Sequence, residues 1–173
     1  MEEFLLRAKS MLETGSQWSR IHAVLGRDQV DVDTLASSLG YAYFLSQKEP
    51  SDCLCVPLVN QRRSEYSLPE QTRAFLQEVR VPESTLLWRD DVDLVQLHAT
   101  GQLTVTLLGG DWLNRGEASS LASSVIRVIH RSERQGHGEG AVPLTAIVTR
   151  EILQEASERL SAPLAGLLRG EGH

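Results

Sequence analysis

The stretch Arg20-Ile-His-Ala-Val-Leu-Gly-Arg-Asp-Gln-Val-Asp-Val-Asp-Thr34 decides the fold of this chain. Its apolar first part predicts a buried strand that ends at Gly26, and a helix of small and apolar residues follows Asp31 and Asp33. Buried strands that lead into helices in this way are typical of α/β proteins with parallel sheets. Two carboxylates just past the carboxyl end of such a strand favour a divalent-metal site.

The rest of the chain continues this alternation of strands and helices. Apolar spacing predicts helices at Glu2–Glu13, Thr34–Leu45, Pro69–Val79 and Thr145–Leu160. Strands are predicted at Ile21–Leu25, Leu54–Val59, Thr85–Trp88, Leu103–Leu108 and Val125–Ile129. We therefore expect a single α/β lobe over residues 1–170, with a mostly parallel five-stranded sheet flanked by helices on both faces. Residues 131–140, which are polar and glycine-rich, predict a flexible loop.

Composition narrows the class of protein. With 41% hydrophobic and 23% charged residues, the 173-residue chain can bury a full core. A net charge of -6 without a basic run argues against nucleic-acid binding, and no apolar stretch is long enough for a membrane span. The two cysteines, Cys53 and Cys55, are expected to be reduced core thiols rather than metal ligands. Reduced thiols predict a cytoplasmic protein. The acidic start at Met1 lacks the order of a signal peptide.

The metal interpretation of Asp31 and Asp33 has an alternative. Their i, i+2 spacing in an extended segment would aim both carboxylates the same way, as a hard divalent cation requires. Asp is also a common helix N-cap, and one of the pair could simply cap the following helix. Asp90 lies at the end of another predicted strand and could reach the same crevice, or belong to a solvated acidic turn. The candidate metal ligands are thus Asp31, Asp33 and Asp90.

A third strand end carries Gly109-Gly110-Asp111. Two glycines at this position allow a positive φ or a close approach of backbone. The dinucleotide fingerprint and the lysine of a phosphate-binding loop are both absent from this segment.

These landmarks, in this order, resemble the prune proteins of the Asp-His-His phosphoesterase superfamily. The similarity covers nearly the whole chain and is carried by the segments MEEFLLRAKSML, DVDTL, CVPLVNQRRSEY, ESTLLWRDDVDL, GQLTVTLLGGDWL, VTREILQEA and LAGLLRG. The resemblance implies that Asp31 and Asp33 match the first metal-binding motif and that Asp90 matches the second. It also implies the strand order 2-1-3-4-5, with a topological switch point beside the strand that ends at Gly26.

Departures from the family pattern weigh against catalysis. Active relatives carry Asp-His-His where this chain has Gly109-Gly110-Asp111, so a bridging carboxylate and two imidazoles are missing. Arg27 stands where active prune proteins have Asn. Val142-Pro143-Leu144 replaces the small and hydroxyl residues that open a helix near the phosphate. The last-motif aspartate and the closing domain of the family find no match in residues 1–173, so the resemblance implies an incomplete form of the family's two-lobe protein.

Two functions follow from the resemblance. The first is a catalytically inactive, prune-like interaction or regulatory module that binds an unknown protein partner, in the control of growth or differentiation. The second is a manganese-dependent phosphoesterase acting on pyrophosphate, short polyphosphate or cyclic nucleotides. No cofactor is expected beyond residual Mn²⁺ or Mg²⁺. The C-terminal leucines Leu160, Leu164, Leu167 and Leu168 recur at helical spacing and predict an exposed stripe that favours self-association, partner binding or fraying. The alternative is that this stripe packs back on the sheet.

Overall fold

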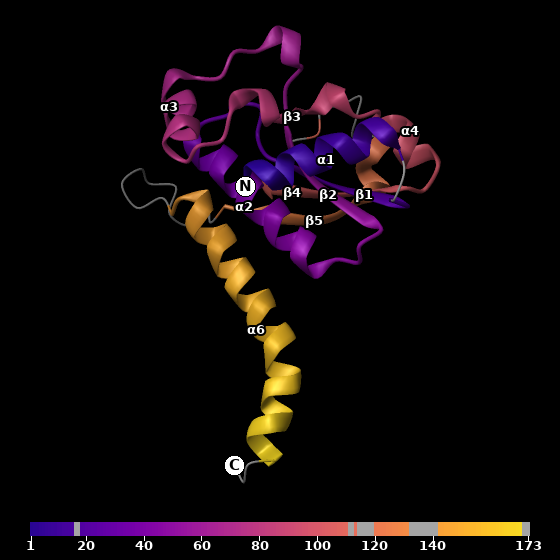
Figure 1. The fold of residues 1–173 in the computed structure, drawn as a ribbon, viewed down its shortest axis with the longest axis vertical. Helices are drawn as coiled ribbons and strands as arrows, with labels where there is room; N and C mark the ends of the chain where they lie inside the picture. Colours follow the sequence, from indigo (N-terminus) through magenta and orange to yellow (C-terminus); the bar gives the residue numbers. More distant parts are fainter. Residues whose placement is uncertain (16–17, 111–112, 114–119, 132–141, 171–173) are drawn as a thin grey trace.

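Five parallel strands form one sheet in the residues that the computed structural model describes, 1–15, 18–110, 113, 120–131 and 142–170 (Figure 1). The strands are β1 (Arg20–Leu25), β2 (Cys53–Val59), β3 (Leu87–Trp88), β4 (Leu103–Gly109) and β5 (Val125–His130). Their spatial order is β3-β2-β1-β4-β5, and each neighbouring pair is parallel. The predicted α/β class, with its five-stranded parallel sheet, is confirmed.

The predicted strand order 2-1-3-4-5 is wrong. The short strand β3 pairs with β2 at Leu58 and Val59 and lies at the sheet edge, while β4 pairs with β1 from Ile21 to Leu25. The chain thus moves outward from β1 through β2 to β3 and then returns to the other side of β1. The reversal falls between β1 and β4, so the switch point does lie beside the strand that ends at Gly26.

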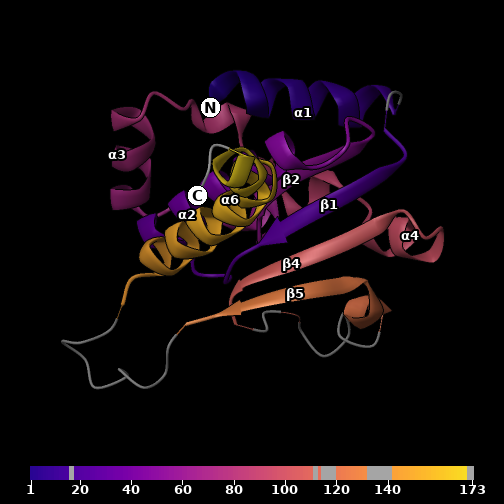
Figure 2. The ribbon, with the colours of Figure 1, turned by 90° about the horizontal axis from the view of Figure 1, so that it is seen from below.

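Helices cover both faces of the sheet (Figures 1 and 2). The helices are α1 (Glu2–Thr14), α2 (Val32–Lys48), α3 (Glu70–Glu78), α4 (Leu94–Ala99) and α6 (Leu144–Gly170). Ala8 of α1 and Leu94 of α4 pack on one face, against residues such as Val56 and Val105. On the other face, Tyr41 of α2 and Val148 of α6 pack with Cys55, Leu108 and Ile129. The sequence did not predict α4.

A polar network fixes α6 to the body of the fold. Arg127 of β5 forms ion pairs with Glu151 and Glu155 of α6, and Lys48 of α2 pairs with Glu155 at 2.9 Å. Tyr41 also donates to Glu155 at 3.1 Å. Burial, followed by the charge of Glu155, raises the pKa of the Tyr41 hydroxyl. Although burial opposes its ionisation, hydrogen bonds from Lys48 and Arg127 hold the pKa of Glu155 below its usual value. The network therefore joins α2, β5 and α6.

The C-terminal part of α6 runs past the sheet and projects from the rest of the fold (Figure 1). Of this helix, side chains are described only to residue 157. The predicted leucine stripe at Leu160 to Leu168 therefore lies outside the described side chains, and its exposure stays a prediction. The loop predicted at residues 131–140 also lies, apart from Arg131, outside the described residues. In the described part of the chain, no helix combines the length and the apolar character that crossing a membrane requires.

A buried histidine links the two central strands on either side of the switch point. His22 of β1 is only 6% exposed, and its ring nitrogens lie 2.7 and 2.8 Å from the hydroxyl oxygens of Thr104 and Thr106 on β4. Burial, together with the charges of Arg20 and Lys48, lowers the pKa of His22 to about 4. The neutral ring is therefore part of the hydrogen-bonded core.

Candidate metal-binding edge of the sheet

The carboxyl ends of β1, β2, β3 and β4 bring the sequence-predicted residues to one edge of the sheet. This edge flanks the switch point between β1 and β4, where ligands bind in open α/β sheets. The loop after β1 carries Asp31, the first turn of α2 carries Asp33, and the 3-10 turn Arg89–Asp91 after β3 carries Asp90. What decides the chemistry of this edge is what each carboxylate contacts.

Asp31 is the N-cap of α2. Its backbone is extended (φ -78°, ψ 176°), and its Oδ1 accepts a hydrogen bond from the backbone N–H of Thr34 at 2.8 Å. The capping alternative is therefore confirmed for Asp31. Close packing sets the position of this turn, because a Cβ on Gly26 would lie 2.6 Å from Cγ2 of Thr34. Gly26 is thus required for the approach of α2 to the end of β1.

Asp33 lies in the first turn of α2, not in an extended segment. The argument that its carboxylate points the same way as that of Asp31 is therefore wrong, since residues two apart on a helix point to different sides. Its Oδ2 accepts from the backbone N–H of Leu144 at 2.8 Å, and its Oδ1 from that of Thr145 at 2.8 Å. The guanidinium of Arg131 also donates to Oδ2 at 2.9 Å. Asp33 thus binds the N-terminus of α6 and a cation of its own chain.

Asp90 is exposed and holds the backbone of the loop that follows β2. Its Oδ1 accepts from the backbone N–H of Arg63 at 3.1 Å. The neighbouring Asp91 accepts from the Arg63 guanidinium at 2.5 Å and from the backbone N–H of Trp88 at 2.8 Å. The acidic cluster after β3 therefore joins two loops of the same edge through Arg63.

Sequence reasoning missed a buried amide that ties three strand ends together. Asn60, 6% exposed, follows β2 and donates through Nδ2 to the carbonyl of Gly26 at 2.9 Å. Its Oδ1 accepts from Arg89, which follows β3, at 2.7 Å. Burial, and then the charge of Arg62, lowers the pKa of Arg89. Asn60 could have been found from the sequence, because it is a polar residue at the end of an apolar strand. A buried amide at such a place must have hydrogen-bond partners.

The end of β4 has a backbone that glycine favours. Gly109 has φ 92° and Gly110 has φ 152°, a range that residues with a side chain rarely adopt. Of the two roles that the sequence left open for these glycines, a positive φ is observed at both positions. Asp111 lies outside the described residues, and so does any contact it makes.

The described residues do not fit a binuclear metal site. Within residues 1–15, 18–110, 113, 120–131 and 142–170, no group of three or more His, Cys, Asp or Glu side chains is arranged to hold a metal ion. Asp31, Asp33 and Asp90 each accept from a backbone N–H group instead. Their assignment as metal ligands remains a prediction from the family pattern.

The sequence of the whole chain is similar to those of known proteins. The chain is 43% identical over 172 residues to protein prune homolog 2 of Mus musculus, an alignment that covers 98% of the chain. The chain belongs with the prune proteins. It is also 34% identical over 178 residues to exopolyphosphatase PRUNE1 of Mus musculus, and 33% identical to the Homo sapiens protein of that name. No protein-family model matches the sequence.

The chain spans only part of these relatives. It covers 6% of the length of prune homolog 2 and 38% of the length of the PRUNE1 proteins. Of these relatives, the PRUNE1 proteins carry the name exopolyphosphatase.

Proposed function

We propose that this chain is a catalytically inactive prune-like domain of the Asp-His-His superfamily, which acts in the cytoplasm as an interaction or regulatory module. The observation that supports this proposal is the environment of Asp33. Its carboxylate accepts two backbone N–H groups of α6 and faces the Arg131 guanidinium. A guanidinium is a cation, so it takes the electrostatic place that a divalent ion would have beside this carboxylate. Asp33 would have to give up α6 before it could bind a metal.

The third motif supports the same proposal. The positions that match the Asp-His-His motif begin with Gly109 and Gly110, which have no side chains to donate oxygen or nitrogen. A binuclear centre needs about six or more donors, and a fixed acid that bridges the ions cannot be replaced by water. Asp31, Asp33 and Asp90 alone supply too few ligands.

A manganese-dependent phosphoesterase is the second candidate. It is favoured by the 34% identity to a protein named exopolyphosphatase, and by the presence of Asp31, Asp33 and Asp90 at the expected strand ends. Pyrophosphate, short polyphosphate and cyclic nucleotides are the substrates to test. If the chain is active, Asp31 is the residue whose loss should abolish turnover.

Calorimetry with Mn²⁺ and a phosphate-release assay on pyrophosphate and tripolyphosphate test the proposal together. We expect no manganese-dependent phosphate release and no tight Mn²⁺ binding by the unmodified chain. Asp31→Ala is the test variant, and Asp28→Ala, at an exposed carboxylate of the same loop, is the matched control. Manganese-dependent turnover that Asp31→Ala abolishes and Asp28→Ala retains would overturn the proposal in favour of the phosphoesterase.

A further inference from the structure

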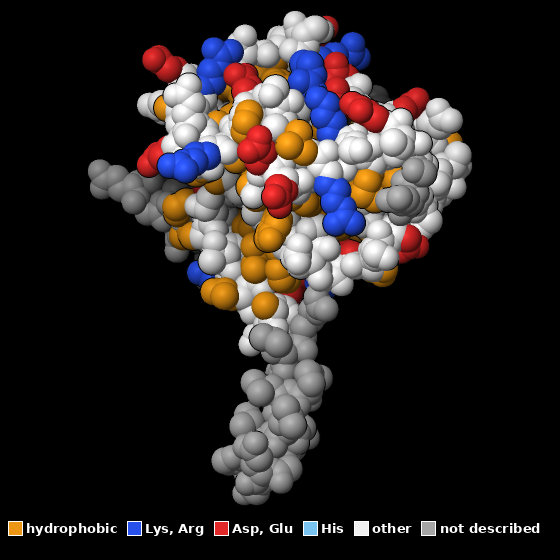
Figure 3. Space-filling model, viewed as in Figure 1, with side chains coloured by type: hydrophobic (Ala, Val, Ile, Leu, Met, Phe, Trp, Pro, Cys, Tyr) orange, Lys and Arg blue, Asp and Glu red, His pale blue; other side chains and the backbone are white. Residues whose placement is uncertain are grey.

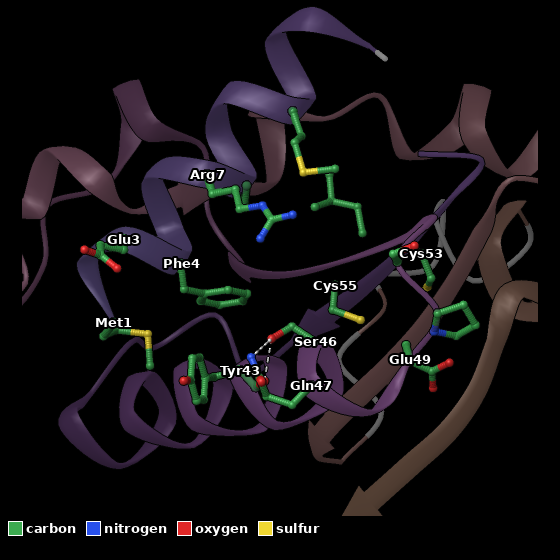
Figure 4. A pocket seen from close by; sticks show the side chains of 15 residues that line it. Met1, Glu3, Phe4, Arg7, Tyr43, Ser46, Gln47, Glu49, Cys53 and Cys55 are labelled. Carbon is green, nitrogen blue, oxygen red and sulfur yellow. Dashed lines mark hydrogen bonds between the residues drawn. The ribbon is translucent and has the colours of Figure 1, made fainter. Parts of the chain in front are cut away.

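A cavity of about 530 Å³ lies between α1 and the C-terminal half of α2, beside the amino-terminal end of β2. Phe4 and Arg7 reach it from α1, Tyr43 from α2, and Cys53 and Cys55 from β2 (Figure 4). Around it, hydrophobic side chains gather on the surface over α2 and the start of α1 (Figure 3). This volume lies in the range of pockets that hold small molecules. The cavity is separate from the carboxyl edge that carries Asp31 and Asp33.

The strand β2 reaches this cavity because its first half is a sheet edge. Within the described residues, β3 pairs with β2 only at Leu58 and Val59, so no strand lies beside Cys53 or Cys55 on that side. As residues i and i+2 of one strand, the two cysteines point to the same face of the sheet. Both are free thiols and both line the cavity. The reduced pair therefore lies on one wall of the cavity.

The surroundings of the two thiols make them chemically different. Arg20 lies in register with Cys53 on the neighbouring strand, so its positive charge favours the Cys53 thiolate. Cys55 lies deeper, at 1% exposure against 8% for Cys53, two residues further along the same strand. The neighbouring thiol of Cys55 first, and then Arg20, lower the pKa of Cys53 to about 6. The neighbouring Cys53, and burial, raise the pKa of Cys55.

We propose that Cys53 is a modification site, at which a low-molecular-weight disulfide that enters the cavity forms a mixed disulfide with the protein. The Cys53 thiolate attacks one sulfur of the disulfide, so a new S–S bond forms as the old one breaks. The second sulfur leaves as a thiolate and takes a proton from water, and the disulfide itself is the oxidant. Arg20 and the Cys55 thiol stabilise the attacking thiolate. Cys55 is a positioning residue and stays reduced.

Other charged groups surround the thiol and shape its titration. Glu49 opposes the formation of the thiolate. Further charged groups come from α1, which lines the cavity, and from the turn before β2: Glu3, Arg7 and Asp52. Arg20 is the cation in register with Cys53 on the neighbouring strand, so Arg20 is the cation to change in a test.

The test is the rate at which the folded chain reacts with 4,4′-dithiodipyridine between pH 6 and pH 8. The release of 4-thiopyridone measures this rate. A thiol with a pKa near 8.5 gains thiolate, and hence rate, by about 80-fold over this range. For Cys53 we expect a rise of only about 2-fold, because about half of the thiol is already ionised at pH 6 and nearly all of it at pH 8. This ratio does not depend on how far burial slows the reaction. Mass spectrometry of a digest should place the adduct on Cys53.

Single substitutions separate the roles of the neighbours. Cys55→Ser keeps a hydroxyl donor and should keep the flat pH profile, whereas Cys55→Ala and Arg20→Gln should each make the rate at pH 6 fall by about fivefold or more. Cys53→Ser should abolish the reaction. An unchanged urea-unfolding midpoint shows that each variant is folded. The proposal is overturned if the wild-type rate rises about 80-fold with pH, if the adduct lies on Cys55, or if the thiols react only in denaturant.

Discussion

The carboxylate oxygen Oδ1 of Asp33 and the backbone nitrogen of Thr145, 112 positions apart in sequence, lie 2.8 Å from each other. This hydrogen bond joins the first turn of α2 to the first turn of α6. Asp33 thus acts as a distant N-cap, in the position that a negative charge favours at the start of a helix. An acid that the family pattern assigns to a metal is here a link between two helices.

Replacing Asp33 by Asn should therefore destabilise the fold. The amide can accept one of the two N–H groups of α6, but its own NH₂ group would face the other donor or Arg131. We expect the free energy of unfolding in urea to fall by about 1–3 kcal/mol. The control Asp28→Asn changes an exposed carboxylate of the same loop and should stay within about 0.5 kcal/mol. Equal stability of the two variants would contradict the capping role of Asp33.

Gly26 and Gly40 should respond to alanine with opposite signs. A Cβ at Gly26 meets Thr34 Cγ2 at 2.6 Å, whereas one at Gly40, inside α2, meets nothing within 4 Å. Gly26→Ala should lower the free energy of unfolding by about 1–3 kcal/mol, because Thr34 is buried beneath a capped turn. Gly40→Ala should raise it by about 0.5–1 kcal/mol through helix propensity. If the contact is the cause, Thr34→Ser, which removes Cγ2, should rescue most of the loss in the Gly26→Ala background.

Sequence reasoning predicted the fold class well because the pattern of apolar residues reports burial directly. The boundaries of β1 and β2 follow from runs such as Cys53–Val59, which is buried throughout. The strand order did not follow, since neither Leu87 nor Trp88 carries a signal that says which strand they pair with. The family resemblance supplied the order 2-1-3-4-5, but β3 lies at the sheet edge beside β2.

The candidate site was predicted only in part, for a related reason. Asp31, Asp33 and Asp90 could be placed at strand ends from local spacing. Their partners, however, come from distant segments: Leu144 and Thr145 for Asp33, and Arg63 for Asp90. The local sequence pattern of a carboxylate followed by a helix is the same in three cases. The carboxylate can bind an ion, cap its own helix or cap another helix.

The burial of His22 should make the protein less stable in acid. Folding lowers the pKa of this imidazole from its usual 6.5 to about 4, so between these values the unfolded chain binds more protons than the folded chain. The contribution of His22 to stability is complete above about pH 6.5 and is lost as the pH falls toward 4. Relative to His22→Asn, the wild-type free energy of unfolding should fall by about 3 kcal/mol between pH 7 and pH 4. Urea unfolding of both proteins across this range measures the difference, and a constant gap between them would refute the prediction.

Restoring the third motif tests how far this edge is from a catalytic one. The change is Gly109→Asp, Gly110→His and Asp111→His. Because Gly109 and Gly110 have positive φ, the new side chains should strain the backbone by about 1–3 kcal/mol at each position. Gly101→Ala is the control, because Gly101 has φ 73° and a new Cβ there meets nothing within 4 Å. Its loss of stability measures the cost of a side chain at positive φ alone. Urea unfolding should therefore show a larger loss for the triple variant than for Gly101→Ala.

The same triple variant should bind Mn²⁺ in calorimetry but release little phosphate from pyrophosphate. The reason is that Asp33 still accepts from Arg131 and from the N-terminus of α6, so the restored ligands gain only part of the carboxylate set. Adding Arg131→Gln removes the competing cation and should tighten Mn²⁺ binding further. If the triple variant alone turned over pyrophosphate as fast as an exopolyphosphatase relative assayed beside it, the contacts of Asp33 would be irrelevant to activity. Tighter binding on removal of Arg131 would instead show that Asp33 is held from the metal by its own chain.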